Sequence, residues 1–122
     1  MDGLLLFAHG ARDAAWARPF EAVAMRLRAA RPGTPLALAY LEFMSPGIEE
    51  AAATLAAAGC TRVHVLPLFL GTGGHVRRDV PPLLERLRER HGPQIDFQLH
   101  LPLGEHDAVL QAICDACLSH IE

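Results

Sequence analysis

The chain has 122 residues, 51% of them hydrophobic, and a formal net charge of −3 at pH 7. This length allows one core and one domain over residues 1–122, and the apolar content excludes a disordered chain. All 11 basic residues are arginine, and the negative net charge excludes a general attraction to nucleic acid. No apolar run approaches the roughly 20 residues of a membrane helix, so we expect a cytoplasmic protein.

Short apolar runs alternate with longer amphipathic segments, as in β-α units around a parallel sheet. The expected strands are 4–8, 36–41, 63–70 and about 95–101. Helical periodicity predicts helices over 13–30, from 45 to 59, from 79 to 91 and over 107–120. Asp13, Ser45 and Asp79 are the expected N-caps, with prolines tolerated in the first turns that follow.

Because crossovers between parallel strands are almost always right-handed, few topologies fit this order. We expect an α/β fold with a four-stranded parallel sheet, strand order 2-1-3-4, and helices on both faces. Ligands of such sheets bind beyond the carboxyl ends of the strands, where the strand order reverses. That point lies between the first and third strands.

The three cysteines, Cys60, Cys114 and Cys117, are an odd number in a chain without export signals, so a disulfide framework is not expected. Cys114 and Cys117 share helical spacing with neighbouring apolar residues, which predicts that both pack on a buried stripe. The alternative is metal or redox chemistry at this pair. The apolar residues of the stripe are Leu110, Ile113, Leu118 and Ile121.

Three possible metal ligands, His9, Glu42 and His75, are equally spaced and follow the ends of the first three strands. One reading is that equal β-α units place unrelated polar residues at loop starts. The other is a shared site, which Gly10 and the glycines of 71–74 favour because glycine lets backbone approach a ligand closely. Neutral imidazole binds divalent cobalt, nickel, iron or zinc, and it also accepts protons near neutral pH.

Arginines lie near the same edge and could bind carboxylates of a substrate. Arg12 follows His9, and Arg77 and Arg78 follow His75; the alternative is ordinary solvated arginine at helix starts. His64, inside the third strand, is expected to be a hydrogen-bonded structural histidine. His106 has a weak claim to the site.

The sequence resembles the small class II chelatases of the CbiX type. The similar segments occur in order along nearly the whole chain. They are residues 4–12, 40–46, 65–70, 74–81 and 102–104. The first contains the His-Gly pair, the second contains Glu42 and Pro46, and the fourth contains Gly74, His75 and Asp79. One departure is Ala11, where the family pattern has serine, which removes a hydroxyl next to the site. The His-rich segment of some members is also missing.

The resemblance implies insertion of a divalent metal into sirohydrochlorin. His9 and His75 would bind the metal or accept the pyrrole protons, with Glu42 assisting, and Arg12, Arg77 and Arg78 would bind the carboxylates of the tetrapyrrole. Cobalt is the metal favoured by resemblance, with nickel and iron open, and no organic cofactor is implied. Longer relatives join two such modules, so a homodimer is expected.

Two other functions stay open at this stage. A metal or tetrapyrrole carrier would use the same ligands without catalysis. A histidine phosphatase would use His9 as its nucleophile, but those enzymes usually place arginine where this chain has Ala8.

Overall fold

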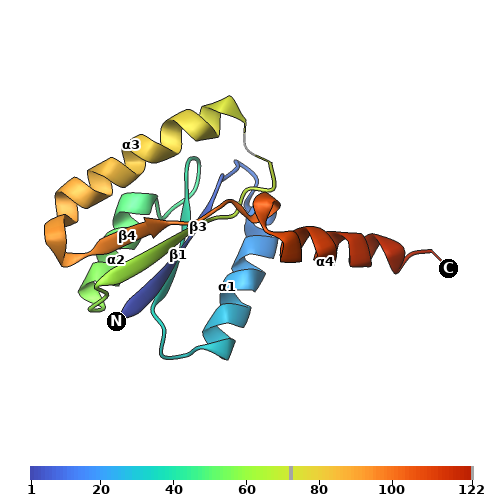
Figure 1. The fold of residues 1–122 in the computed structure, drawn as a ribbon, viewed down its shortest axis with the longest axis horizontal. Coiled ribbons are helices and arrows are strands. Elements are labelled where there is room, and N and C mark those ends of the chain that lie inside the picture. The colour runs from blue at the N-terminus through green and yellow to red at the C-terminus, as the bar shows by residue number, and fades with distance from the viewer. Residues whose placement is uncertain (72, 122) are drawn as a thin grey trace.

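A computed structural model of the chain describes residues 1–71 and 73–121, and the side chains of residues 74–76 are outside this description. The four strands form one parallel sheet in the order β2-β1-β3-β4, which confirms the predicted topology (Figure 1). Their bounds are Asp2–Ala8 for β1, Leu36–Tyr40 for β2, Arg62–Pro67 for β3 and Asp96–Leu99 for β4. β4 ends before the predicted Leu101, which is 60% exposed, because the chain turns away at Pro102.

The helices follow the strands in alternation. They are α1 (Arg18–Ala30), α2 (Ile48–Ala57), α3 (Gly74–His91) and α4 (Asp107–Leu118), with short 3-10 turns η1 (Ala14–Ala17), η2 (Gly92–Gln94) and η3 (Leu103–Glu105). Within the described residues, none of these helices has the length and apolarity to span a bilayer.

The two faces of the sheet bury different sets of side chains, since alternate residues of a strand point to opposite faces. One face, here called the closed face, packs against α2 and α3. Its strand residues are at most 3% exposed: Leu5, Phe7, Val63, Val65 and Phe97. The other face, here called the open face, packs against α1, mainly over β2, and its strand residues include Leu4, Leu6, His64, Leu66 and Gln98.

The start of the first helical segment differs from the prediction. Asp13 is the expected N-cap, and its Oδ1 accepts from the Ala15 N–H at 2.9 Å. However, the helix is divided into η1 and α1, with Pro19 in the first turn of α1. Proline has no N–H to continue the hydrogen-bond ladder from the preceding turn, so the break falls there.

The predicted N-caps of the next two helices were wrong. The Tyr40 N–H donates to the Pro46 carbonyl at 2.9 Å, which holds 41–46 as a loop, and α2 begins after Gly47 instead of Ser45. Asp79 lies inside α3, which begins at Gly74. The prolines inside α3 remove N–H donors, but the helix continues because Val80, Leu84 and Leu87 pack into the closed-face core.

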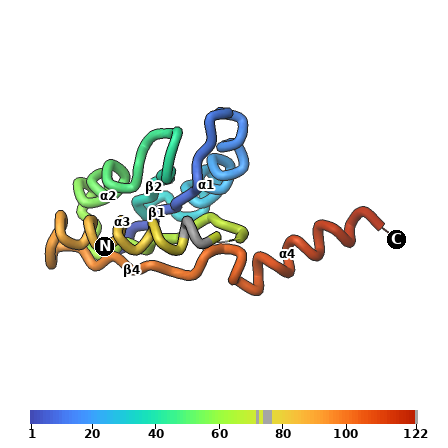
Figure 2. Tube along the Cα trace, turned by 90° about the horizontal axis from the view of Figure 1, so that it is seen from above, coloured from blue at the N-terminus to red at the C-terminus, as the bar shows by residue number. Residues whose placement is uncertain are grey.

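The prediction that Cys114 and Cys117 are buried was wrong for the single chain. Both are exposed, and no residue of α4 is buried. Figures 1 and 2 show α4 extending away from the rest of the domain. In the described part of the chain it packs extensively only against η3, so the helical spacing was correct but no element of the same chain covers the stripe.

Candidate functional site

His9 and Glu42 meet at the carboxyl edge of the sheet. His9 directly follows β1, and Glu42 lies two residues after β2. The Leu41 N–H donates to the Ala8 carbonyl at 3.0 Å, and the Glu42 N–H donates to the His9 carbonyl at 3.1 Å. The His9 Nδ1 atom is 3.5 Å from Glu42 Oε1, and the side chains are 41% and 43% exposed. An imidazole and a carboxylate thus face each other where a ligand can reach both.

Gly10 makes this close approach possible. Its φ is +95°, a region that favours glycine, and a Cβ at this position would overlap the Glu42 carbonyl oxygen. The sequence argument that Gly10 serves the site therefore has a structural basis. Any side chain at position 10 would push the Glu42 backbone away from His9.

His9 also lines a hollow of about 380 Å³ that is mostly apolar. Aromatic side chains border it, and the His9 and Phe69 rings meet edge-on with centroids 6.1 Å apart. Other lining residues include Trp16, Phe20, Leu68 and Leu103. An apolar wall beside a polar pair suits a ligand with a flat conjugated body. Neither Trp16 nor Phe20 was predicted from the sequence to line a site.

Arg12 lies beside the loop that carries Glu42. Its guanidinium carbon is 4.9 Å from the centre of the Phe43 ring, within the range of a cation–π contact. Phe43 is 58% exposed and has a φ of 66°, which is uncommon for a residue other than glycine. Phe43 was not predicted as a site residue, because nothing local in the sequence indicates this conformation.

The structure describes only some of the site residues that were predicted on α3. Arg77 and Arg78 lie in the first turns of α3 and are exposed. Arg77 borders a second hollow of about 320 Å³, which it shares with His100, Glu105 and Phe69. Phe69 lines both hollows. His75 is in the first turn of α3, but its side chain is outside the described residues, so the structure does not test its place beside His9.

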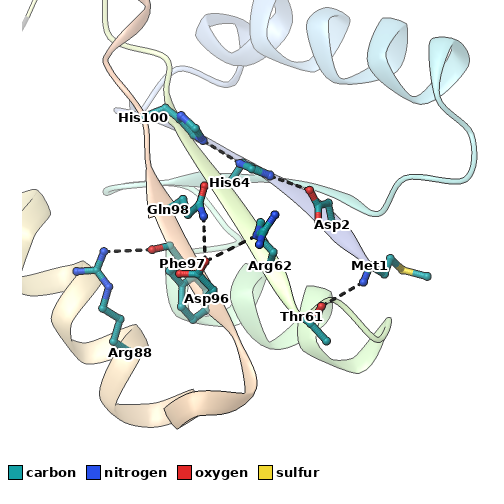
Figure 3. A network of polar contacts seen from close by, with 10 residues as sticks. All are labelled: Met1, Asp2, Thr61, Arg62, His64, Arg88, Asp96, Phe97, Gln98 and His100. Carbon is teal, nitrogen blue, oxygen red and sulfur yellow. Dashed lines mark hydrogen bonds and ion pairs between the residues drawn. The ribbon is translucent and has the colours of Figure 1, made fainter.

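A chain of polar contacts joins His100, His64 and Asp2 on the open face (Figure 3). His64 Nδ1 lies 2.8 Å from His100 Nε2, and His64 Nε2 lies 3.0 Å from Asp2 Oδ2. The hydrogen bond from His64 holds the pKa of Asp2 below its usual value. These contacts confirm that His64 is a hydrogen-bonded structural residue. They also give His100 a partner that the sequence did not identify.

His106 does not join the His9–Glu42 pair through any contact described here. Its Nε2 atom lies 3.0 Å from the Leu101 carbonyl, at the start of α4. Among the described side chains, no group of three or more His, Cys, Asp or Glu residues is arranged to hold a metal ion. The described part of the site is therefore one imidazole, one carboxylate and a neighbouring arginine.

The fold and this site define an α/β protein whose sheet edge presents an imidazole and a carboxylate beside an apolar hollow. The sequence profile of the CbiX family matches residues 3–119. The chain belongs to this family.

Individual relatives agree with this assignment. The crystal structure of a CbiX protein from Marinobacter aquaeolei VT8, described as a cobalamin (vitamin B12) biosynthesis protein, superposes with a TM-score of 0.85 and 32% identity, covering 98% of this chain and 97% of that chain. A sirohydrochlorin cobaltochelatase of Saccharolobus islandicus is 33% identical over 109 residues, covering 85% of this chain and 84% of the relative.

A longer relative also matches. The sirohydrochlorin ferrochelatase of Priestia megaterium is 27% identical over 115 residues, or 94% of this chain, but only 43% of the relative. The chain therefore spans most of one curated relative and less than half of another.

Proposed function

We propose that this chain inserts a divalent metal ion into sirohydrochlorin. The observation that carries the proposal is the His9–Glu42 pair, 3.5 Å apart at the carboxyl edge of a CbiX-type sheet. Relatives of this chain are named sirohydrochlorin cobaltochelatase and sirohydrochlorin ferrochelatase, which agrees in substrate and reaction class.

The reaction exchanges two pyrrole protons for one M²⁺ ion, with no change of redox state. A neutral imidazole can bind the incoming ion or accept a proton, and a carboxylate can do either. We assign these roles to His9, Glu42 and His75 together. The lone pair of His9 or His75 would bind the metal ion as it approaches the macrocycle, and the remaining bases would accept the two pyrrole protons that leave as the metal–nitrogen bonds form.

The apolar hollow beside His9 contributes binding of the macrocycle. Its aromatic border can contact the flat conjugated ring, while the edge with His9 and Glu42 faces the central nitrogens. The carboxylates around the ring require cationic partners. We assign these to Arg12, Arg77 and Arg78, whose guanidinium groups bind carboxylates with two hydrogen bonds where the geometry allows.

Cobalt is the metal that we propose, with nickel and ferrous iron as alternatives. Relatives are named for both cobalt and iron, so the family alone does not choose between them. Nitrogen and oxygen ligands bind these ions with affinity rising from iron through cobalt to nickel, and cellular supply selects among them. No organic cofactor takes part in the proposed reaction.

We also propose that the enzyme works as a cytoplasmic homodimer. The matched segment makes up 43% of the ferrochelatase relative, which leaves room for a second such module in that protein, and a two-fold pair of chains would be the equivalent arrangement. The exposed stripe on α4 supports association.

The test is an anaerobic absorbance assay of sirohydrochlorin with Co²⁺, Ni²⁺ or Fe²⁺. We expect His9→Ala and His75→Ala each to lower the rate by about 100-fold or more, as is typical for loss of an acid–base group. Glu42→Gln should also slow insertion, whereas Glu50→Gln, a matched change on the exposed face of α2, should not. Insertion by the native chain no faster than the uncatalysed reaction would leave only a carrier function.

The proposed binding of substrate carboxylates by arginine is tested separately, through the KM for sirohydrochlorin. Replacing both Arg77 and Arg78 by alanine should raise the KM for sirohydrochlorin and leave the folded state unchanged. An unaltered KM would remove these residues from the substrate site.

A further inference from the structure

A second hollow, at the carboxyl ends of β3 and β4, adjoins the one that holds His9. It has a volume of about 320 Å³ and a mostly apolar wall, which includes Pro67 and Leu99 at the ends of these strands. Phe69 lines both hollows, so they share a border. The volume is at the lower end for a small-molecule site, so it suits one arm of a large ligand better than a whole ring.

Three side chains on the wall of this second hollow can carry a charge. They are Arg77, His100 and Glu105. The positive charge of the guanidinium and the negative charge of the carboxylate cancel, so these two give the hollow no net charge. Among its described lining residues, the net charge of the hollow therefore depends on whether His100 binds a proton.

His100 is the last member of a hydrogen-bonded chain on the open face (Figure 3). Its Nε2 atom lies 2.8 Å from Nδ1 of His64, and Nε2 of His64 lies 3.0 Å from Oδ2 of Asp2. The two imidazole rings have centroids 5.0 Å apart and planes inclined by 27°. The facing nitrogens thus lie between the ring centres, as in an N–H···N hydrogen bond. They are too close for a metal ion to bind between them.

The carboxylate of Asp2 fixes the direction of this chain of hydrogen bonds. An ionised carboxylate only accepts, so His64 donates to it from Nε2. A neutral imidazole has a single N–H, so Nδ1 of His64 then accepts from Nε2 of His100. His100 has thereby used its own N–H. Its Nδ1 atom, the nitrogen left for a ligand in the hollow, offers a lone pair.

The charges around Asp2 keep it in the carboxylate form that this direction requires. The hydrogen bond from His64 is the largest influence that lowers the pKa of Asp2, and the charges of Arg62 and the amino terminus lower it further. Arg62 also pairs with Asp96 at 3.7 Å. The acceptor at the far end of the chain is therefore retained at neutral pH.

Uptake of one proton changes what His100 offers to the hollow. Both of its nitrogens then carry N–H groups, of which one stays bonded to His64 and the other can donate to a carboxylate in a charge-assisted hydrogen bond. The proton also gives the hollow a net positive charge, shared with Arg77. Without the proton, a carboxylate in the hollow would meet the lone pair of Nδ1.

We propose that His100 and Arg77 together bind one carboxylate arm of sirohydrochlorin, and that His100 takes up one proton as the arm enters. The proton comes from solvent, and no covalent bond of the ligand changes. His64 and Asp2 are positioning residues, since they hold the ring and the proton of His100 without touching the ligand. The inference rests on the proposed chelatase function and concerns binding of the substrate, not insertion of the metal.

The first experiment measures the binding of metal-free sirohydrochlorin by anaerobic calorimetry near pH 7. Buffers of different ionisation enthalpy give the number of protons taken up per ring bound. The native chain should take up more than His100→Ala, by up to one proton, and His100→Ala should bind about 10-fold more weakly. His120→Ala, after the end of α4, is the matched control and should behave as the native chain. Equal proton uptake by the native chain and His100→Ala overturns the inference.

The second experiment separates the proton from the shape of the side chain. His100→Gln can still donate to a carboxylate but cannot take up a proton, so its binding should lack the extra uptake. Asp2→Asn keeps an acceptor for His64 and removes the charge, so it should reach native affinity only at lower pH. Quenching of Trp16, the single tryptophan and part of the hollow beside His9, measures the affinity across pH. An unchanged pH profile in Asp2→Asn contradicts the proposed chain.

The outcomes distinguish this inference from the chelatase proposal. If the native chain does not bind sirohydrochlorin, both fail. If the native chain binds sirohydrochlorin and inserts metal, but His100→Ala keeps the native affinity and proton uptake, only the inference fails. Arg77→Ala should weaken binding at every pH, because a guanidinium stays charged, whereas the effect of His100→Ala should shrink as the pH rises. Parallel pH profiles for these two variants contradict proton uptake at His100.

Discussion

The two faces of the sheet differ in how their apolar residues are covered. On the closed face, α2 and α3 bury Val63, Val65 and Phe97 almost completely within one chain. On the open face, α1 covers mainly the β2 side, and His64 and Leu66 remain half-buried. On both faces, inward-facing residues alternate along the strands as expected. An apolar pattern in the sequence therefore identifies a surface that is to be buried, but it does not identify the element or the chain that covers this surface.

The largest effect should follow from a change on the closed face. Leu84→Ala removes a side chain that is 1% exposed in the α3 core, and we expect a loss of about 2–5 kcal/mol in the free energy of unfolding. Urea unfolding measures it, and the loss should be the same at every protein concentration. A loss that varies with concentration would mean that this face also depends on the second copy.

A change on the open face should have a smaller effect that depends on concentration. Leu66→Ala should cost about 1–3 kcal/mol when the chain is concentrated and less when it is dilute, if a second copy covers this half-buried residue in the proposed homodimer. The same urea titration at two protein concentrations provides the measurement. Equal losses at both concentrations would make the open face complete in the monomer.

Thiol reactivity offers a comparison within one molecule. Burial raises the pKa of Cys60, which packs with the closed-face core, and the thiolate is the reactive form. Since Cys114 and Cys117 are exposed, Cys60 should therefore be the last of the three cysteines to react with maleimide, as followed by mass spectrometry. Earlier labelling of Cys60 than of Cys117 would contradict the description of the closed face.

The smallest effect concerns Asp2 at the edge of the open face. Its pKa is lowered from 3.8, chiefly by the hydrogen bond from His64, so the folded state favours the carboxylate. The stabilisation is present above pH 3.8 and is lost as the pH falls through the lower folded pKa. Asp2→Asn should be less stable than the native chain at pH 7, and the difference should disappear in acid. If the difference in stability persists at low pH, it arises from the packing of the side chain and not from the charge of the carboxylate.

Much of the fold could be predicted because parallel strands with right-handed crossovers leave few arrangements, and the observed order is the predicted one. Helix starts were less predictable. Ser45 and Asp79 have the chemistry of N-caps, but Tyr40 fixes the loop before α2 through the Pro46 carbonyl, and core contacts carry α3 through its prolines. These contacts connect residues that a local pattern does not relate.

The candidate site was predictable where it depends on strand ends. His9 and Glu42 follow neighbouring strands, so topology alone brings them together. Phe43 was missed because its contact with Arg12 depends on a left-handed backbone conformation. His100 was missed because its contact with His64 depends on the register between β3 and β4.

The backbone hydrogen bond between Glu42 and His9 also affects how the pair moves. The Glu42 N–H donates to the His9 carbonyl, and Gly10 lies directly against the Glu42 carbonyl. The backbones of His9 and Glu42 are therefore expected to move as one unit. A fluctuation of either loop then displaces the imidazole and the carboxylate together. Their separation should vary less than the position of either, so the sheet edge can yield to a bulky ring while the spacing between the two groups is preserved.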